Sequence, residues 1–412
     1  MILSSALQIP LGTQPQNTES VADPGGSWWS GRRYTKAKQD VGPESAKKVA
    51  TYFRCLNTIS DDIASMPLQQ FSRVTVNKLN LTYKVDPDAR LRNMAYLLEV
   101  SPNRFMATPF VFKKTVVMWM LSWGISLIWA PPPPAPRELF ILPTNTSQPK
   151  FDRQGYLWYE VIFPNGDKRY IPSVEVTPVM INSTNGIWGK SVLEYAAETI
   201  GLRMGMGETQ NSIQGQGLNP SAYVQINSTL DAKGRQAYRE AYQEVMSGTE
   251  NAGNLAVFDN KVVKFEPITM KLTDAQFLES MDHTDLDIAN FFKFPAYKLN
   301  MGKQAYNSNE QQDLDYLKST LDPHLVQWEQ SARLHWLAES EQKSNYFKFI
   351  RESILRTDAK SRAELHEIQI RSGTLQPNEA REIEDRNGYP DGDKFWMTSN
   401  NTEIGGTPNA PA

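Results

Sequence analysis

Residues 282–323, DHTDLDIANFFKFPAYKLNMGKQAYNSNEQQDLDYLKSTLDP, place a polar loop between two strongly patterned helices. Before the loop, residues 273–292 carry acidic side chains and no Lys or Arg, and their apolar side chains recur mostly every three or four residues, which is typical of an amphipathic helix. Pro295 ends that helix, because proline lacks a backbone N–H and restricts the residue before it. Apolar residues from Leu314 to Trp336 then predict a second, long helix. We therefore expect the loop between the two helices to be exposed.

The N-terminal part of the chain divides by composition and pattern. Residues 1–40 are polar, lack periodicity and are rich in Gly, Pro, Gln and Ser, so we expect them to be disordered or ordered by a partner. The apolar spacing of residues 46–63 predicts an amphipathic helix that Pro67 ends. Strands dominate beyond residue 110, and Asn165-Gly166 predicts a tight hairpin turn, because both residues tolerate positive φ.

A glycine-rich helix is predicted at residues 191–214, and residues 220–270 follow with a strand, helix, strand pattern. Each glycine weakens a helix by about 1 kcal/mol relative to alanine. Either close approach of neighbouring helices offsets this loss, or the helix frays near Gly207. The glycines concerned are Gly201, Gly205, Gly207, Gly215 and Gly217.

Residues 115–130, TVVMWMLSWGISLIWA, resemble a membrane span in composition. They are shorter than the roughly 20 residues needed to cross a bilayer, and polar or small residues interrupt them. A buried helix running into a strand is the better interpretation, and we expect no membrane partner.

Composition favours no catalytic chemistry. The chain has 412 residues, a net charge of −3, four histidines and one cysteine, Cys55, which we expect to be a buried, inert thiol in a reducing compartment. The histidines show no metal-ligand spacing, and no nucleophile is paired with a base. We therefore predict no enzyme activity, no metal and no cofactor.

An ordered set of short motifs runs from about residue 41 to residue 394. Its members around the loop are Ile288-Ala289, Phe292, Pro295, Asn300, Tyr306, Asn309-Glu310 and Leu321-Asp322-Pro323. Further members are Tyr52-Phe53-Arg54-Cys55, Met66-Pro67-Leu68, Pro102-Asn103, Gly186-Ile187-Trp188-Gly189, Ile354-Leu355-Arg356-Thr357-Asp358 and Ser372-Gly373-Thr374. No single motif is specific, but the ordered set resembles the portal proteins of long-tailed bacteriophages.

This resemblance implies an α+β portal fold with an α/β wing, a helical stem, a small α/β clip and a C-terminal helical crown. The implied parts are an N-terminal arm (1–40), wing (41–188), first stem helix (189–218), clip (219–271), second stem helix (272–293), tunnel loop (294–308), long helix returning to the wing (309–350), crown (351–395) and flexible tail (396–412).

The function implied by the resemblance is structural. Portal proteins form a ring, usually of twelve copies, at one capsid vertex, and double-stranded DNA passes through it during packaging and ejection. The implied partners are further copies of the chain, DNA bound without sequence specificity, the terminase large subunit, the major capsid protein and scaffold, and the head-tail connector. The implied locations are the virion and, during assembly, the host cytoplasm.

Two groups of residues are candidates for the lining of such a channel. The tunnel-loop candidates touch the DNA backbone without reading bases; they are Tyr297, Lys298, Asn300, Met301, Lys303, Gln304, Tyr306 and Asn307. Glu279, Asp282 and Asp285 form an acidic line that repels phosphates if it faces the channel, and is otherwise a solvated outer face. The loop has the same open alternative, an ordinary surface loop.

The sequence departs from the family in the wing, where residues 131–134 are four consecutive prolines and residues 177–179 (TPV) occupy the place of a histidine found in relatives. Two alternative functions remain. Lys190 and Ser191 at a helix start, with Asp259 ending an apolar strand, suggest a P-loop NTPase, although the glycine required at position 184 is a threonine. The second alternative is a non-catalytic scaffold that forms no ring.

Overall fold

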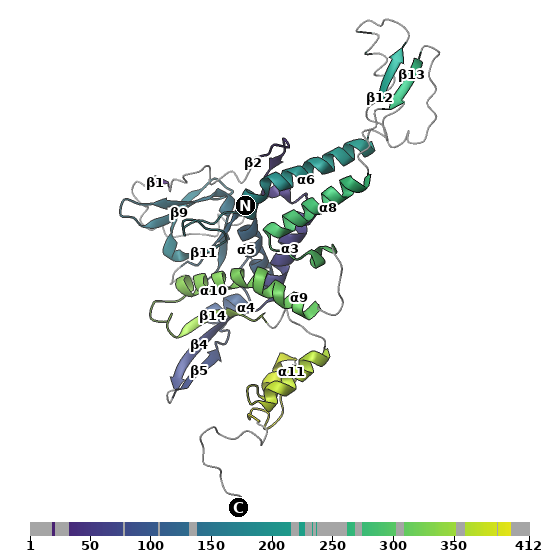
Figure 1. The fold of residues 1–412 in the computed structure, drawn as a ribbon. Helices are drawn as coiled ribbons and strands as arrows, with labels where there is room; N and C mark the ends of the chain where they lie inside the picture. The colour runs from purple at the N-terminus through teal and green to yellow at the C-terminus, as the bar shows by residue number, and fades with distance from the viewer. Residues whose placement is uncertain are drawn as a thin grey trace, which may run out of the picture. The chain divides into compact units, whose positions relative to one another are not determined.

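The computed structural model describes residues 19–20, 33–76, 79–105, 108–131, 138–215, 222–226, 233, 236, 262–267, 274–301, 309–351, 359–384 and 386–396 (Figure 1). They form helices and small antiparallel sheets. The chain divides into two compact units, one comprising Met1–Asn307 with Asp315–Ile350 and the other Ser308–Leu314 with Arg351–Ala412.

Two helices form the centre of the first unit. Helix α3 (Ala50–Ser65) packs on α5 (Pro109–Trp123), and α2 (Pro43–Ala46) and α4 (Met94–Glu99) lie before and after α3 in the chain. The predicted amphipathic helix is thus formed and ends before Pro67. Cys55 is fully buried in it, and burial raises the pKa of its thiol to about 12, as expected for an inert cysteine.

The apolar stretch at residues 115–130 is a buried helix that runs into a strand, as predicted. The Thr108 side chain caps α5 by accepting the Val111 N–H at 3.2 Å, and Gly124 ends the helix with a φ of 87°. All residues of the following strand β6 (Ile125–Trp129) are buried. Among the residues placed in the structure, no helix combines the length and apolar character needed to span a membrane.

Two sheets carry much of the core. Strand β6 lies between β11 (Val176–Met180) and β7 (Phe140–Leu142), and the second sheet has the order β1 (Glu19–Ser20), β8 (Ser147–Phe151), β9 (Leu157–Ile162), β10 (Lys168–Pro172). Short turns η1 (Thr144–Thr146) and η2 (Ser173–Glu175) connect them. The β9–β10 hairpin confirms the predicted turn, but only Gly166 takes a positive φ, of 88°; the Asn165 side chain instead accepts the Asp167 N–H at 3.1 Å.

The predicted long helix is interrupted by a wider turn. Helix α9 (Asn309–Tyr316) continues through the π-helical turn η6 (Leu317–Leu321) into α10 (Asp322–Trp336). The wide turn lies directly before Pro323, which has no N–H to donate and whose ring would clash with the carbonyl four residues earlier. The chain then forms β14 (Asn345–Phe349), which pairs with β4 (Leu68–Val76) beside β5 (Leu79–Lys84). Residues 309–350 therefore return to the predicted wing through a strand.

Helices α6 (Val192–Gly215) and α8 (Asp274–Phe291) lie side by side (Figure 1). Strands β12 (Ala222–Ile226) and β13 (Val262–Pro267) pair in the predicted clip, most of which lies outside the described residues. Helix α6 runs unbroken past Gly207, so the predicted fraying there is wrong.

A strap at residues 33–41 accounts for one of the unusual glycines. Strands β2 (Arg33–Tyr34) and β3 (Asp40–Val41) pair in this strap, although the sequence predicted that residues 1–40 need a partner for order. Thr35 is buried against α6, and a Cβ placed on Gly201 would lie 2.5 Å from its Oγ1 atom. Gly201 therefore leaves room for the chain's own N-terminal strap.

The second unit contains α11 (Ala359–Arg371) and α12 (Pro377–Ile383). Asn378 holds the following turn: its amide donates to the Asp393 carboxylate at 2.7 Å and to the Tyr389 carbonyl at 3.1 Å, and it accepts the Tyr389 N–H at 2.9 Å. In the described part of the chain, no cluster of His, Cys, Asp or Glu is suited to hold a metal ion.

Candidate functional site

The base of the predicted tunnel loop is folded as far as Met301. Helix α8 ends at Phe291, and Lys293 then takes a φ of 52°. The short helix η4 (Ala296–Leu299) ends at Asn300, which has a φ of 60° and donates its N–H to the Tyr297 carbonyl at 3.1 Å. The Met301 N–H reaches the Ala296 carbonyl at 3.2 Å. These bonds satisfy the carbonyls that a helix end leaves free.

The loop candidates differ in exposure. Asn300 is exposed, whereas Tyr297 and Met301 are half-buried. Lys303, Gln304, Tyr306 and Asn307 lie outside the described residues.

Lys298 is held by two side chains from elsewhere in the chain. Its Nζ atom lies 3.4 Å from Asp62 Oδ2, on α3, and 4.2 Å from the centre of the Tyr316 ring. Only 23% of the Lys298 side chain and 27% of the Asp62 side chain are exposed. The ammonium group thus has both an ion pair and a cation–π contact.

Tyr316 completes this cluster from α9. Its hydroxyl donates to Asp62 Oδ2 at 2.9 Å, and its ring meets Phe294 edge-on, with centroids 5.9 Å apart. Burial, followed by the neighbouring Asp62 carboxylate, raises the pKa of Tyr316 well above its ordinary value, so the phenol stays protonated. Sequence reasoning missed Asp62 and Tyr316, because no periodicity links residues so far apart in the chain.

A second contact joins the end of α8 to η6. Thr320 is buried, and its hydroxyl donates to the Lys293 carbonyl at 2.5 Å. The backbone entering the loop is therefore tied to the helix that follows the loop.

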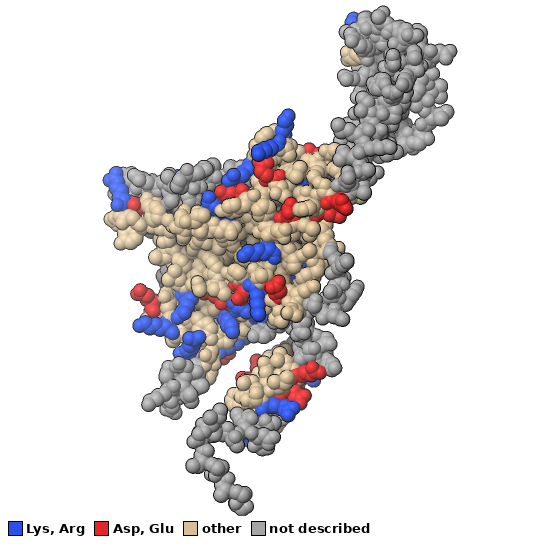
Figure 2. Space-filling view, in the orientation of Figure 1, with Lys and Arg blue, Asp and Glu red and all other residues tan. Residues whose placement is uncertain are grey.

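One of the three residues predicted to form an acidic line on α8 is not on the exposed side. Glu279 and Asp282 are exposed, and acidic side chains gather over the N-terminal half of α8 (Figure 2). Asp285 is instead buried against α6, where the Arg203 Nε atom donates to its carboxylate at 3.0 Å. The carboxylate at position 285 therefore joins α6 and α8.

The segment that the NTPase alternative would use as a phosphate loop packs backbone to backbone against Gly124. A Cβ on Gly189 would lie 2.0 Å from the Gly124 carbonyl oxygen. Lys190 Nζ lies 3.4 Å from the Glu194 carboxylate, and Ser191 Oγ accepts the Glu194 N–H at 3.2 Å as a helix cap. Asp259 lies outside the described residues. These groups serve the start of α6, and the glycine needed to wrap phosphates is missing at position 184.

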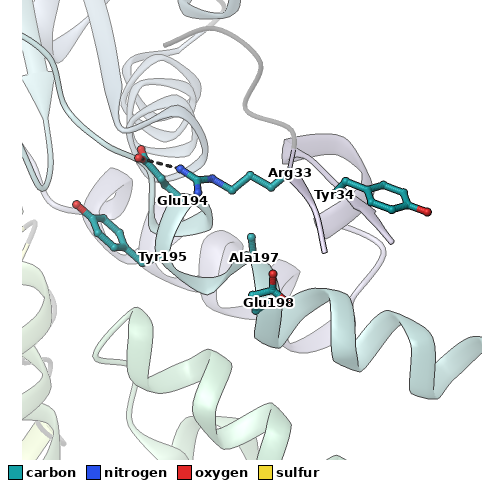
Figure 3. Close-up of a pocket in the computed structure, with 6 residues that line it drawn as sticks. All are labelled: Arg33, Tyr34, Glu194, Tyr195, Ala197 and Glu198. Atoms are coloured by element: carbon teal, nitrogen blue, oxygen red, sulfur yellow. Dashed lines mark hydrogen bonds and ion pairs between the residues drawn. The ribbon is translucent and has the colours of Figure 1, made fainter. Parts of the chain in front are cut away.

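A hollow of about 270 Å³ lies between the strap and α6 (Figure 3). Arg33 crosses it to reach Glu194 at 3.1 Å, and the Lys36 N–H donates to the Glu198 carboxylate at 3.2 Å. The Gln39 amide donates to Glu208 at 2.7 Å. The strap is thus fixed along α6 by three glutamates.

The second unit contains a larger hollow, of about 590 Å³, between α11, α12 and the turn that follows. His366 lines it, with Nε2 3.7 Å from the Glu384 carboxylate. Arginines Arg371, Arg381 and Arg386 also line it, and Arg381 donates to the Asn387 carbonyl at 2.7 Å. The His366 side chain is therefore partly enclosed, with 17% of it exposed.

A model of the phage portal protein family matches residues 50–385. The chain belongs to the phage portal protein family, and the predicted α+β portal fold is confirmed. Portal proteins are structural connectors, so this chain is not an enzyme.

Two curated portal proteins show the extent of the similarity. The portal protein of Enterobacteria phage HK97 is 24% identical over 395 residues, which cover 89% of each chain. The probable portal protein of Streptomyces phage phiC31 is 28% identical over 228 residues, covering 53% of this chain and about half (49%) of that protein.

Solved structures share the fold. A crystal structure of an HK97-family phage portal protein from Corynebacterium diphtheriae gives a TM-score of 0.54 at 16% identity, covering 78% of this chain and 96% of that chain. A chain from the neck of a native gene transfer agent particle, computed with C12 symmetry, gives a TM-score of 0.52 at 15% identity. The match covers 87% of this chain and 96% of that chain.

Proposed function

We propose that this chain assembles into a ring at one capsid vertex, through which double-stranded DNA is packaged and ejected. The observation that carries the proposal is the family match over residues 50–385, reinforced by the similarity to a chain of a particle neck with C12 symmetry. The proposed ring has about twelve copies, and the C12 symmetry of that neck supports this number. The net charge of −3 is consistent with passage, because a strongly basic surface would retain DNA.

The ring's proposed partners follow from its place in the particle. Before DNA is packaged, the capsid protein and scaffold surround it; the terminase large subunit docks during packaging, and head-tail connectors replace the terminase afterwards. The chain is made in the host cytoplasm and ends in the virion.

The proposed channel lining combines the loop and part of α8. Asn300 and Met301, at the described end of the loop base, lead into Lys303, Gln304, Tyr306 and Asn307, which contact the DNA backbone. Glu279 and Asp282 repel phosphates from the stem and keep the polymer from adhering. Tyr297 supports the loop base.

The first test is the mass and symmetry of the purified chain, by light scattering and negative-stain imaging. The proposal expects an annular particle of about twelve copies with a central hole. A chain that stays monomeric even when capsid protein and scaffold are supplied would contradict it and favour the scaffold alternative. In packaging reactions, deletion of residues 302–308 is expected to impair DNA passage and leave ring assembly intact.

A further inference from the structure

Lys298 is the one described lysine in the predicted loop, and an exposed lysine there would suit a DNA phosphate. Its surroundings show a different use. The ammonium group lies within 3.4 Å of Asp62 and over the Tyr316 ring at 4.2 Å, and about three-quarters of the side chain is covered. A lysine in this position is already neutralised by its own chain.

The three partners come from three separate segments. Asp62 lies in the last turn of α3, Lys298 in η4 at the loop base, and Tyr316 at the end of α9. One carboxylate oxygen, Asp62 Oδ2, receives both the Tyr316 hydroxyl and the Lys298 ammonium. Removing such partners from a half-buried carboxylate costs more free energy than removing them from an exposed one, because less water can take the place of the lost partners.

Backbone turns and a hydrogen bond also fix the base of the loop. The left-handed residues Lys293 and Asn300 reverse the chain on either side of η4, and Leu299 is buried between them. Thr320 fixes the Lys293 carbonyl. The side-chain cluster therefore holds a compact segment that ends at Met301.

We propose that Asp62, Lys298 and Tyr316 form a clasp that positions the base of the loop, and that Lys298 acts through this clasp and not as a DNA contact. The clasp itself is independent of what passes the loop; its consequence for DNA passage rests on the proposed function.

Hydrogen exchange of the amides of Asn300 and Met301, in the assembled full-length protein, tests the clasp directly. Lys298→Met, Asp62→Asn and Tyr316→Phe are each expected to speed exchange there about tenfold, because each removes a hydrogen bond or ion pair to a charged group. Lys293→Met is the matched control, since that side chain is exposed in the same segment. Unchanged exchange in all three clasp variants would overturn the proposal.

A double-variant comparison separates positioning from DNA contact. With a clasp, Asp62→Asn combined with Lys298→Met exchanges no faster than the more affected single variant, because both remove one shared interaction. In packaging reactions run over a series of salt concentrations, the two single variants are then expected to lose DNA passage alike, with unchanged salt dependence.

If Lys298 contacts phosphate instead, Asp62→Asn frees the lysine and preserves passage, whereas Lys298→Met reduces passage and weakens its salt dependence. That pattern would overturn the proposal that Lys298 acts through the clasp. If neither the variants nor the wild-type chain forms a ring even with capsid protein and scaffold supplied, the proposed function fails, and the exchange measurement on the purified chain still decides the clasp.

Discussion

Gly201→Ala offers a quantitative test of the strap, because α6 contains its own control. A methyl group on Gly201 would lie 2.5 Å from Thr35 Oγ1 and 2.6 Å from Thr35 Cγ2, distances at which the strap has to move. A methyl group on Gly207 would have Arg203 Nη1 as its nearest neighbour, at 3.9 Å, which is ordinary contact.

The two substitutions share one favourable effect and differ in one unfavourable effect. Alanine stabilises a helix interior by about 1 kcal/mol relative to glycine at either position. Overpacking at Gly201 costs about 1–3 kcal/mol in addition. We therefore expect Gly207→Ala to raise the free energy of unfolding by about 1 kcal/mol, and Gly201→Ala to lower it by up to ~2 kcal/mol.

The assay is urea unfolding at one fixed protein concentration, because association changes apparent stability. Trypsin cleavage after Lys36 or Lys38 reports release of the strap, and it is expected to increase in Gly201→Ala only. Thr35→Ala removes the two nearest atoms, so adding it to Gly201→Ala is expected to recover part of the loss. Equal stability of the two glycine variants would refute the reasoning, and lost ring assembly with an intact strap would favour neighbouring helices as the reason for Gly201.

Three further predictions follow from individual polar side chains. Burial lowers the pKa of Lys113 from 10.5 to about 8. Between these pH values the unfolded chain binds more protons than the folded chain, so the free energy of unfolding rises with pH. Measured by urea unfolding from pH 7.5 to 10.5, the free energy of unfolding of the wild type is expected to rise relative to that of Lys113→Met by up to ~3 kcal/mol. Asp285→Ala is expected to lower the free energy of unfolding by ~2 kcal/mol, since it leaves Arg203 unpaired, whereas the exposed Asp282→Asn changes it by less than about 0.5 kcal/mol. Asn378→Ala is expected to accelerate hydrogen exchange at Tyr389 at least about tenfold, because three hydrogen bonds to the turn are lost; exchange unchanged there would contradict the role given to Asn378.

Features set by nearby residues could be predicted from the sequence. Pro295 ends α8 and Gly124 separates α5 from β6, because the backbone restrictions of proline and glycine act within a few residues. The short length of the apolar stretch was enough to favour a buried helix followed by a strand. The π-helical turn before Pro323 was missed, although a proline inside a periodic helical pattern signals such an irregularity.

Contacts between distant segments could not be predicted in this way. Helical spacing placed Asp285 with Glu279 and Asp282, but only the packing of α6 decides which of them is buried. Lys298 and Asp62 are 236 residues apart in sequence, and nothing in either local pattern distinguishes a paired lysine from one available to DNA. Gly201 signalled a close approach, but the approaching segment lay in a stretch whose composition indicated disorder.

Helix α8 runs from its contact with α6 to the loop base, and this link constrains any motion of the two helices. Its middle is fixed to α6 by Asp285 and Arg203. Immediately beyond its C-terminal end, Phe292 packs edge-on against Tyr52 of α3, with centroids 5.4 Å apart, and the Lys293 carbonyl is bound by Thr320. An unbroken helix transmits displacement along its axis, since its backbone bonds resist stretching. A shift of α6 and α8 as a pair would therefore either move the loop base or break its contacts with α3 and η6, so the Tyr52–Phe292 contact, the Thr320 hydrogen bond and the clasp would together oppose such a shift.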